Sequence, residues 1–406
     1  MRLRLLILLT LGLFSSGIWA QLKPRPDAFP PQYNYPPTKS VQMATTLTEM
    51  ADWDRYPTYP LYLEMMRRWA QEYPALCRVD TIGLSVNGRL ILALEMSGDL
   101  SNTTLPQFFY SSTIHGDEVT GYVMLLRLID TLLSGYGANQ YYTRLLDSTF
   151  ISINPLANPD GTYHSGDLTV QNATRENACR VDLNRNYPDP FRSGSITVQP
   201  ENEAMIAYVS RRHFRLSANL HGGAEVLNYP WDSFRSSRHS HPAANWWIEV
   251  CRRFIDTSRV YNNNHFLDTY SCGYTAGGDW YVIPNGRQDY MNYYHNCLEM
   301  TMEISTDKTL DAAQLPAYWQ FLQAPMVNYI AEIHSLPPDS LYLGMPIVET
   351  DEARIVVRQR CIEVLDGREP VHVYDLMGRE VGLHVPSAGI YLVRVGERCP
   401  HKVVVL

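Results

Sequence analysis

A strand pattern that leads directly into a polar loop constrains the fold more than any other part of this chain. Residues 107–118 read QFFYSSTIHGDE, in which strand-forming residues end at a Gly-Asp break. His115 and Glu118 follow this strand, and residues 119–133 then place apolar side chains at helical spacing. A strand, a polar loop and a helix in this order predict an α/β layer, in which functional residues gather at the carboxyl ends of strands.

Other parts of the chain extend this pattern. Helical spacing of apolar residues predicts a helix over 59–73 and a closing helix over 311–334. Residues 78–96 read as two strands joined by a turn at Asn87-Gly88. Short apolar or alternating runs predict further strands at 150–155, 215–220 and 298–305. Strands alternating with helices favour an α/β fold over an all-β fold.

Two histidines and a carboxylate occur at the ends of these strands. His115 and Glu118 follow the first strand, and His221 follows the strand at 215–220. A single His-x-x-Glu pair is more often an ordinary helix cap than a metal site. Two histidines and one glutamate together are a ligand set for zinc that leaves a position for water, which is typical of a catalytic metal. The sequence therefore predicts a catalytic zinc site.

Several other polar residues could serve chemistry at the same place. Glu303 is a carboxylate in an otherwise apolar strand, so it could accept a proton from an attacking water. The alternative is that it faces solvent from an edge strand. Arg175, Asn184 and Arg185 lie in a turn-rich loop. They are either solvated surface residues or a set of donors that grips a carboxylate, since guanidinium groups bind carboxylates through two parallel hydrogen bonds.

The two ends of the chain differ from this central part. Residues 1–20 carry two arginines, an apolar core and small residues, and we expect a signal peptide there. Residues 21–40 hold six prolines and read as a leader or linker, and 337–350 read as a second linker. Short β patterns over 351–406 predict a small β-sandwich. The net charge of −8 argues against a nucleic-acid-binding protein.

The cysteines do not suggest a disulfide scaffold. Seven cysteines in 406 residues are sparse, and their odd number leaves at least one unpaired within the chain. No pairing follows from spacing alone. Cys361 and Cys399, in the C-terminal segment, are the pair to test first.

The order of these residues resembles a known family, the zinc carboxypeptidases of the M14 type and their regulatory (N/E) branch. The resemblance covers residues 59–336 and rests on GLSVNGR, HGDEVTG, NPDG, the loop from Arg175 to Pro188, ANLHGG with NYPWD, and GDWYVIPNGRQDY followed by CLEMTMEIS. It implies an α/β fold with a mixed central sheet flanked by helices. The catalytic domain would occupy 41–336, and a small all-β domain would follow at 351–406.

The resemblance also implies a role for each candidate residue. His115, Glu118 and His221 correspond to the ligands of one zinc ion, and Glu303 to the general base. Arg175 corresponds to the arginine that stabilises the oxyanion, and Tyr281 to the tyrosine that closes over bound substrate. Two pairs correspond to substrate-binding positions: Asn184 with Arg185 for the terminal carboxylate, and Asp232 with Gln288 in the side-chain pocket.

The last fifty residues or so depart from that branch, which usually continues into a transthyretin-like domain. They read VHVYDLMGREV, SAGIYLVRVG and KVVVL, and they resemble the sorting domain of proteins exported by the type IX secretion system. The alternative is a small stabilising β domain. The resemblance implies the export machinery as a partner and a secreted or cell-surface location.

The expectation is thus a secreted zinc metallocarboxypeptidase that acts on peptide or protein C-termini. Asp232 would favour C-terminal Lys or Arg, although Arg287 nearby could pair with it and reduce the preference. The alternative is that Asp232 only caps or turns the loop after Trp231. One alternative is a carboxypeptidase acting on peptidoglycan stem peptides. Another is a surface binding protein that keeps the fold without catalysis, which retention of Glu303, both arginines and Tyr281 disfavours.

Overall fold

The computed structural model describes residues 41–192, 196–338 and six short segments of the C-terminal part: 355–358, 361–364, 371–375, 379–387, 389–395 and 401–405. The chain divides into two compact units at Leu336 and Pro337. The predicted signal peptide, the proline-rich leader, residues 339–350 of the linker and Cys399 lie outside the described residues, as does the Cys361 side chain.

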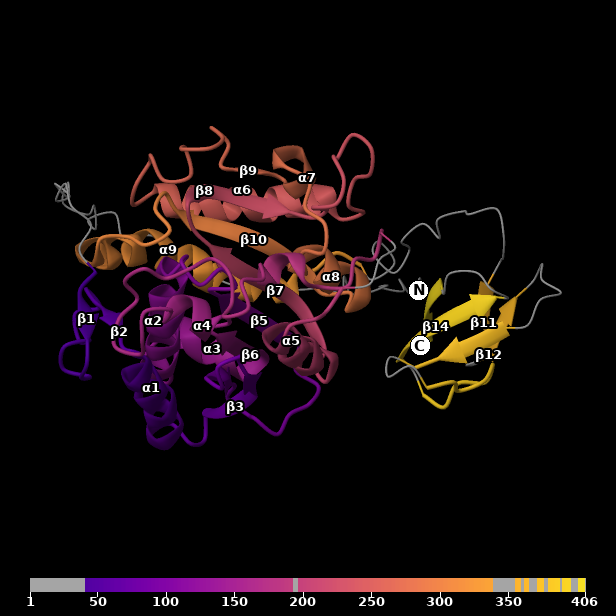
Figure 1. Cartoon of the computed structure of the whole chain (residues 1–406), viewed down its shortest axis with the longest axis horizontal. Helices are drawn as coiled ribbons and strands as arrows, with labels where there is room; N and C mark the ends of the chain where they lie inside the picture. Colours follow the sequence, from indigo (N-terminus) through magenta and orange to yellow (C-terminus); the bar gives the residue numbers. More distant parts are fainter. Residues whose placement is uncertain are drawn as a thin grey trace, which may run out of the picture. The chain divides into compact units, whose positions relative to one another are not determined.

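The first unit is built on an eight-stranded mixed sheet, in the order β3-β4-β6-β5-β7-β10-β8-β9 (Figure 1). The middle strands β6, β5, β7 and β10 run parallel, whereas β3, β4 and β8 pair antiparallel to their inner neighbours. The predicted mixed sheet is therefore confirmed. Its strands are β3 (Cys77–Leu84), β4 (Leu90–Met96), β5 (Gln107–Ser112), β6 (Phe150–Asn154), β7 (Phe214–His221), β8 (Ala224–Tyr229), β9 (Tyr274–Ala276) and β10 (Leu298–Ser305).

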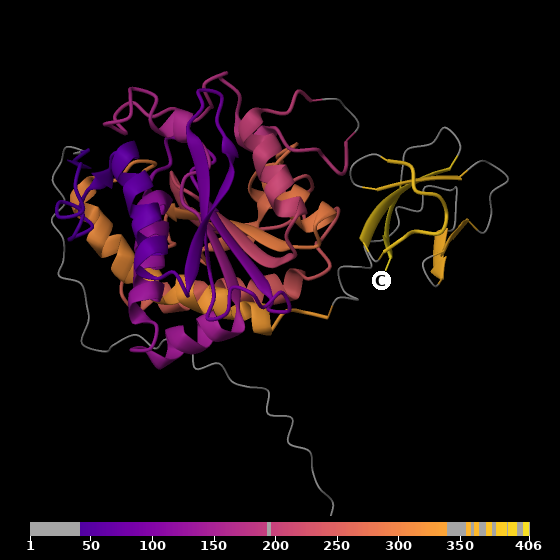
Figure 2. The ribbon, with the colours of Figure 1, turned by 90° about the horizontal axis from the view of Figure 1, so that it is seen from below.

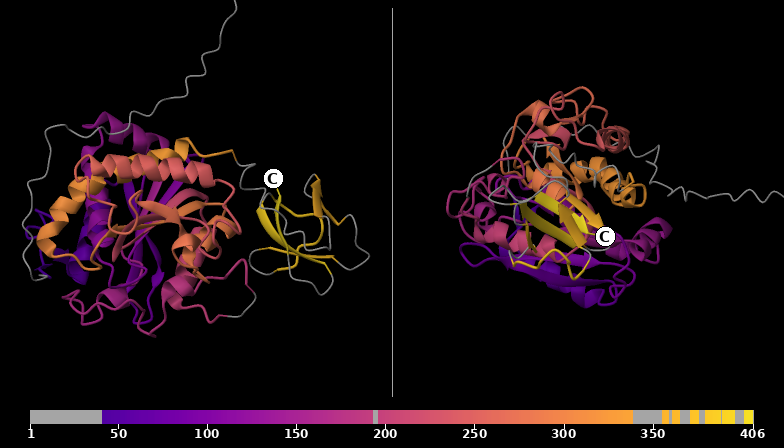
Figure 3. Two further views of the ribbon diagram at one scale, coloured as in Figure 1. Left: turned by 90° about the horizontal axis from the view of Figure 1, so that it is seen from above. Right: turned by 90° about the vertical axis from the view of Figure 1, so that its right-hand side faces the viewer.

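Helices cover both faces of this sheet, as Figures 2 and 3 show. One face packs against α1 (Tyr59–Glu72), α2 (Thr120–Gly135), α3 (Gln140–Ser148), α6 (Ala244–Arg259) and α9 (Leu315–Ala331). The other face meets α5 (Pro200–Ser210) and α8 (Arg287–Tyr294). Successive side chains of β5 point to opposite faces of the sheet. The Tyr110 hydroxyl donates to the Met326 carbonyl of α9 on one face, and Ser111 accepts a hydrogen bond from Arg287 of α8 on the other.

Shorter elements complete the unit. They are β1 (Met43–Ala44), β2 (Tyr56–Pro57), α4 (Pro159–Thr162), α7 (Gly277–Trp280) and three 3₁₀ turns, η1 (Leu183–Arg185), η2 (Ala312–Gln314) and η3 (Glu332–His334). The predicted turn at Asn87-Gly88 joins β3 and β4. Gly88 has a φ of 81° there, a conformation that glycine adopts without strain. None of the described helices is long and apolar enough to cross a membrane.

Two expectations need correction. Strand β10 lies between β7 and β8, and all eight of its residues are buried, so the edge-strand alternative for Glu303 is wrong. The predicted helix over 311–334 is three pieces, η2, α9 and η3. The Asp311 side chain caps the Ala313 amide and Pro316 opens α9, because proline fits a first helical turn better than an interior position.

The second unit is a small all-β structure. Strands β11 (Ile355–Arg358) and β12 (Cys361–Val364) pair antiparallel, and β13 (Val371–Tyr374), β14 (Gly389–Val395) and β15 (His401–Val405) form a three-stranded antiparallel sheet. A compact set of buried side chains forms its core: Ile362, Val373, Val385, Tyr391 and Val393. This part of the fold matches the predicted class.

Candidate metal centre and active site

Three predicted metal ligands converge at the carboxyl ends of β5 and β7. His115, Glu118 and His221 are all buried, and one ligand atom from each lies within 4.8 Å of the others. Glu118 Oε1 lies 3.0 Å from His115 Nδ1, and Glu118 Oε2 lies 2.8 Å from His221 Nδ1. The two Nδ1 atoms are 3.1 Å apart. Two imidazoles and a carboxylate thus point at one position, as a catalytic zinc site requires.

Backbone contacts hold the loop that carries His115 and Glu118. The Gly116 amide donates to the Arg175 carbonyl, and the Val119 amide donates to the Lys308 carbonyl. A Cβ at Gly116 would lie 2.4 Å from the Gly161 carbonyl carbon. Only glycine therefore allows the loop to approach the NPDG turn this closely.

The outer ring nitrogens of the two histidines have different partners. His115 Nε2 lies 3.1 Å from Asp182 Oδ1, and His221 Nε2 lies 2.9 Å from Asn219 Nδ2. Both contacts orient the rings so that Nδ1 faces the shared position. The sequence analysis missed both partners, although Asp182 opens the LNR turn as its N-cap and Asn219 sits two residues before His221.

The protonation of this group suits a metal. Burial lowers the pKa of His221 to about 4, so the ring is neutral. Burial alone would raise the pKa of Glu118, but His115 and His221 together bring it well below its usual value. A neutral imidazole and an ionised carboxylate are the forms that bind zinc. Burial lowers the pKa of His115, but Glu118 and Asp182 together raise it above its usual value, so a metal ion would compete with a proton at this ring. The donor set of two imidazoles and a carboxylate fits zinc.

Glu303 lies on β10 in register with His221 on β7 and Val226 on β8. Its side chain is buried, and Oε2 has no hydrogen-bond partner among the described residues. Burial raises the pKa of this carboxyl well above its usual value, and the nearby charge of Glu118 raises it further. An unpaired buried carboxylate beside a metal-ligand group is a candidate proton acceptor.

The predicted arginine lies at the same group. Arg175 Nη1 is 3.1 Å from His115 Nδ1 and 3.5 Å from Glu118 Oε1. Its Nε donates to Asp182 Oδ2 at 3.0 Å. Asp182 therefore holds both a histidine ligand and the arginine.

The structure also brings the remaining predicted residues to this region. Asn184 Oδ1 accepts from the Arg287 amide at 2.9 Å, and Arg185 Nη1 donates to the Asn184 carbonyl at 2.9 Å. Tyr281 is 44% exposed, and its ring centroid lies 4.9 Å from that of Trp280. Burial raises the pKa of Tyr281, Glu303 raises it further, and Arg185 opposes them.

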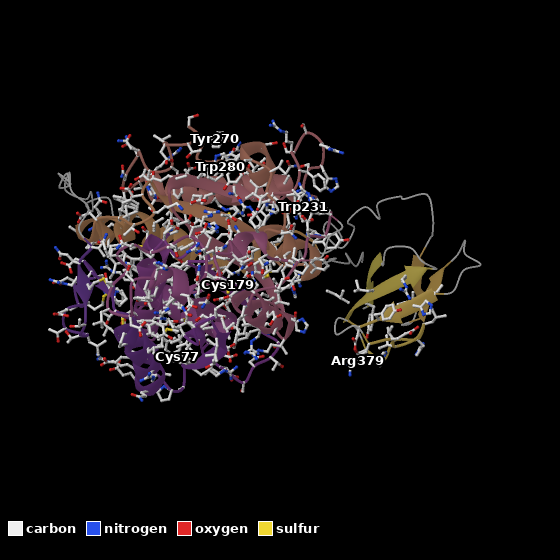
Figure 4. The ribbon with its side chains drawn as sticks, in the orientation of Figure 1. Cys77, Cys179, Trp231, Tyr270, Trp280 and Arg379 are labelled. Atoms are coloured by element: carbon white, nitrogen blue, oxygen red, sulfur yellow. The ribbon has the colours of Figure 1, made fainter. Side chains whose placement is uncertain are left out.

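Asp232 and Gln288 meet as a buried polar pair. Gln288 Nε2 donates to Asp232 Oδ1 at 2.7 Å. The Asp232 and Ser233 amides both donate to Asp289, a residue that the sequence analysis missed. Burial raises the pKa of Asp232 well above its usual value, Asp289 adds to this, and Arg185 opposes it. Asp232 follows Trp231, which is marked in Figure 4.

Arg287, which the sequence suggested could pair with Asp232, pairs with a different carboxylate. It pairs with Glu299 at 3.0 Å, donates to Ser111 and lies 5.0 Å from the Phe109 ring centroid. The possibility that it neutralises Asp232 is therefore wrong, because its guanidinium pairs with Glu299 of β10.

Lys308 is a further cation at this group that the sequence did not reveal. It pairs with Asp117 at 3.0 Å and lies 3.5 Å from Glu118.

Comparison with known proteins agrees with this geometry. A family model described as zinc carboxypeptidase, Peptidase M14, matches residues 62–324. The chain belongs to this family. The predicted family is confirmed, and membership in it implies zinc. His115, Glu118 and His221 form a group that could bind a metal ion.

The similar proteins are carboxypeptidases of the regulatory branch. Carboxypeptidase M from Mus musculus is 34% identical over 282 residues, which cover 65% of this chain and 62% of carboxypeptidase M. The catalytic chain of carboxypeptidase N from Mus musculus is 31% identical over 317 residues and 69% of each chain. Carboxypeptidase D from Anas platyrhynchos is 33% identical over 282 residues. The match spans 66% of this chain but only 20% of that protein.

Solved structures confirm the fold. Thrombin-activatable fibrinolysis inhibitor aligns with a TM-score of 0.60 at 18% identity, over 70% of this chain and 76% of its own. Carboxypeptidase A from Helicoverpa armigera aligns with a TM-score of 0.55 at 20% identity, over 69% of this chain and 75% of its own.

The five cysteines of the first unit are free thiols: Cys77, Cys179, Cys251, Cys272 and Cys297. Figure 4 marks Cys77 and Cys179.

Proposed function

We propose that this protein is a zinc metallocarboxypeptidase that hydrolyses the C-terminal peptide bond of peptides and proteins. One observation carries the proposal: a buried His-Glu-His group lies beside a buried, unpaired carboxylate, Glu303, and an arginine, Arg175. Membership in the zinc carboxypeptidase family supports it.

His115 and His221 would hold one zinc ion through Nδ1, and Glu118 through its carboxylate. When bound, zinc supplies a Lewis acid that polarises the scissile carbonyl and makes a water more acidic. Asp182 and Asn219 orient the two imidazoles from behind. The chain thus supplies three ligands and the side chains that orient them.

Glu303 is the general base in this proposal. Its unpaired Oε2 takes a proton from the attacking water and passes it to the leaving amine. Arg175 stabilises the negative charge that develops on the carbonyl oxygen, held in place by Asp182. Asn184 and Arg185 bind the terminal carboxylate of the substrate, and Tyr281 closes over it.

Hydrolysis of a blocked dipeptide tests the proposal directly. Release of the free C-terminal amino acid by the purified protein would support an enzyme. Binding of the same dipeptide without any turnover, in protein of confirmed zinc content, would instead support a surface binding protein. Release of an amino acid from peptidoglycan stem peptides, but not from blocked dipeptides, would redirect the substrate class.

We further propose a preference for C-terminal Lys or Arg, set by Asp232. The carboxylate is buried and its Oδ1 accepts from Gln288, so an apolar substrate side chain would leave it without a charged partner. A charge-assisted hydrogen bond predicts about a 10- to 100-fold higher kcat/KM for Arg or Lys than for Phe. Matched blocked dipeptides ending in Arg, Lys, Phe and Glu measure this preference.

Asp232→Ala should remove the preference while Phe substrates are still cleaved. Asp279→Ala is a matched control, because Asp279 is an exposed aspartate on α7 whose side chain accepts from Ser236. It should keep the ranking of the unmodified protein. Equal cleavage of Phe and Arg substrates, or an unchanged ranking in Asp232→Ala, would contradict the pocket assignment and leave the carboxypeptidase proposal standing.

We also propose that the C-terminal unit is an export signal and that the protein works outside the cell. Deleting residues 371–406 should leave a folded, active enzyme inside the outer membrane, because the first unit has its own sheet and core. Activity assays on cell fractions of the producing organism measure its location. Normal surface display of the shortened protein would rule out the signal.

A further inference from the structure

The proposed side-chain pocket holds two buried carboxyl groups rather than one. Asp232 is 2% exposed and Asp289 is 1% exposed. Asp289 Oδ1 accepts from the Asp232 amide at 2.8 Å, and Asp289 Oδ2 accepts from the Ser233 amide at 2.9 Å. Because one acid contacts the backbone of the other, the two carboxyl groups are close neighbours. The charge of Asp289 therefore opposes ionisation of Asp232.

The hydrogen bonds determine which acid ionises first. Both oxygens of Asp289 accept from backbone amides, which can only donate, so they stabilise its ionised form. Asp232 Oδ1 accepts from Gln288 Nε2 at 2.7 Å. The orientation of that side-chain amide is fixed, because Gln288 Oε1 accepts from the Thr301 amide at 2.6 Å. Asp289 thus becomes negative more easily, and Asp232 keeps its proton to a higher pH.

The nearby cations have other partners. Arg287 lies on the same helix as Asp289, but its guanidinium pairs with Glu299. The charge of Arg185 favours ionisation of Asp232, while its Nη1 donates to the Asn184 carbonyl. The charge of Glu299 acts on Asp232 in the opposite direction. The pocket is therefore short of positive charge, which a basic substrate side chain would supply.

Burial acts on both acids in the same direction. It raises the pKa of Asp289 to about 6, and Asp189 raises it further. It raises the pKa of Asp232 well above its usual value, and Asp289 adds to this. Burial also lowers the pKa of His241 to about 3, so that ring is neutral above this pH. Three further titratable side chains face this pair or the adjacent Trp231 ring: Tyr281, His239 and His241.

We propose that Asp232 and Asp289 form a two-acid pocket in which a C-terminal Arg or Lys side chain takes the place of a proton. In the free protein near neutral pH, Asp289 is ionised and Asp232 holds the proton. When a basic side chain enters, it keeps its own protons, the proton of Asp232 leaves to solvent, and the carboxylate pairs with the cation. An apolar side chain releases no proton. This inference rests on the proposed function and on the place of Asp232 in the pocket.

The preference for Arg over Phe should therefore rise with pH. At low pH Asp232 is protonated and neutral, and the preference appears as the pH rises through its raised pKa. The ratio of kcat/KM for blocked dipeptides ending in Arg and Phe should rise at least about 10-fold between about pH 5 and about pH 9. The ratio cancels the pH dependence of the shared reaction centre, and the Arg guanidinium does not titrate in this range.

Asp289→Asn should move this profile to lower pH. Asparagine keeps the size of the side chain and removes its charge, so Asp232 ionises more easily and the midpoint should fall by about one pH unit. Asp232→Ala should give a low ratio that does not change with pH. Adding Asp289→Asn to it should have no further effect on the ratio, because Asp289 acts through Asp232. A role limited to packing would change the rates and leave the midpoint where it is.

Asp311→Asn is the matched control. Asp311 is 4% exposed, and its carboxylate also accepts from a backbone amide, that of Ala313 at 3.0 Å. Asparagine caps a helix as well as aspartate does, so the profile should not move. Thermal unfolding and turnover of the Phe substrate check that each variant is folded. If Asp289→Asn does not fold, the profile of the unmodified protein decides.

The possible outcomes have different meanings. A strong preference for Arg that stays constant from about pH 5 to about pH 9 would overturn the inference and leave Asp232 in the pocket. An unchanged midpoint in folded Asp289→Asn would also overturn it. Equal cleavage of Arg and Phe at every pH would remove the pocket assignment as well. Failure to cleave either dipeptide would instead overturn the proposed function.

Discussion

Exhaustive removal of zinc is expected to abolish hydrolysis, and adding zinc back is expected to restore it. Arg175 and Lys308 are cations beside the proposed ligand group, and both already pair with carboxylates, Arg175 with Asp182 and Lys308 with Asp117. Without the ion, the carbonyl is not polarised and the water is not acidified, so Glu303 alone cannot drive the attack. Turnover of a blocked dipeptide before chelation, after chelation and after adding zinc, together with measured metal content, tests this.

The metal-free protein should remain folded. The ligand group lies at the carboxyl ends of β5 and β7, and the eight-stranded sheet has an extensive buried apolar core of its own. Circular dichroism of the chelated sample separates loss of metal from loss of fold. Full activity in protein shown to contain no metal would defeat the zinc assignment and leave the family membership intact.

Glu303→Gln is expected to lower kcat by at least about 100-fold while zinc stays bound. Glutamine keeps the shape of the side chain and cannot take a proton from water. Its neutral amide also removes the like charge near Glu118, so metal binding should not weaken. Steady-state kinetics with a metal analysis of the same sample distinguishes loss of the base from loss of the ion.

Glu225→Gln provides the control for this substitution. Glu225 is a buried carboxylate on the neighbouring strand β8, in register with Ile304. Its oxygens contact His265, Tyr318 and the Phe266 amide, so it is already paired. Glu225→Gln should leave kcat near that of the unmodified protein. Near-normal turnover in Glu303→Gln would place the general base on another residue.

The sequence supported a large part of the fold because local patterns encode it. Period-2 alternation at 298–305 and the apolar run at 107–112 each became strands of the sheet, β10 and β5. Several elements were not predicted, among them α8 and the strand β8. Helix α8 has only eight residues, six of them buried, including charged Arg287 and Asp289, so it shows no clear apolar and polar faces.

The candidate site was accessible from sequence wherever a residue follows a strand. His115, Glu118 and His221 could be grouped because the carboxyl ends of parallel strands meet at one edge of a sheet. Residue types made Glu303 a candidate proton acceptor and Arg175, Asn184 and Arg185 candidate donors to a carboxylate, each with a solvent-facing alternative. The family resemblance gave these residues their specific roles, which stay predictions until substitutions are measured.

The sequence by itself determined the family, the class of fold and the ligand group, because these depend on strand ends and residue types that local patterns display. Only the tertiary structure decided which side chains support that group. His115 and His221 are 106 positions apart, and Arg287 reaches Ser111 across 176. Hydrogen bonds between such distant residues depend on strand order and helix placement. For that reason Asp182, Asn219 and the Arg287–Glu299 pair became visible only in the folded molecule.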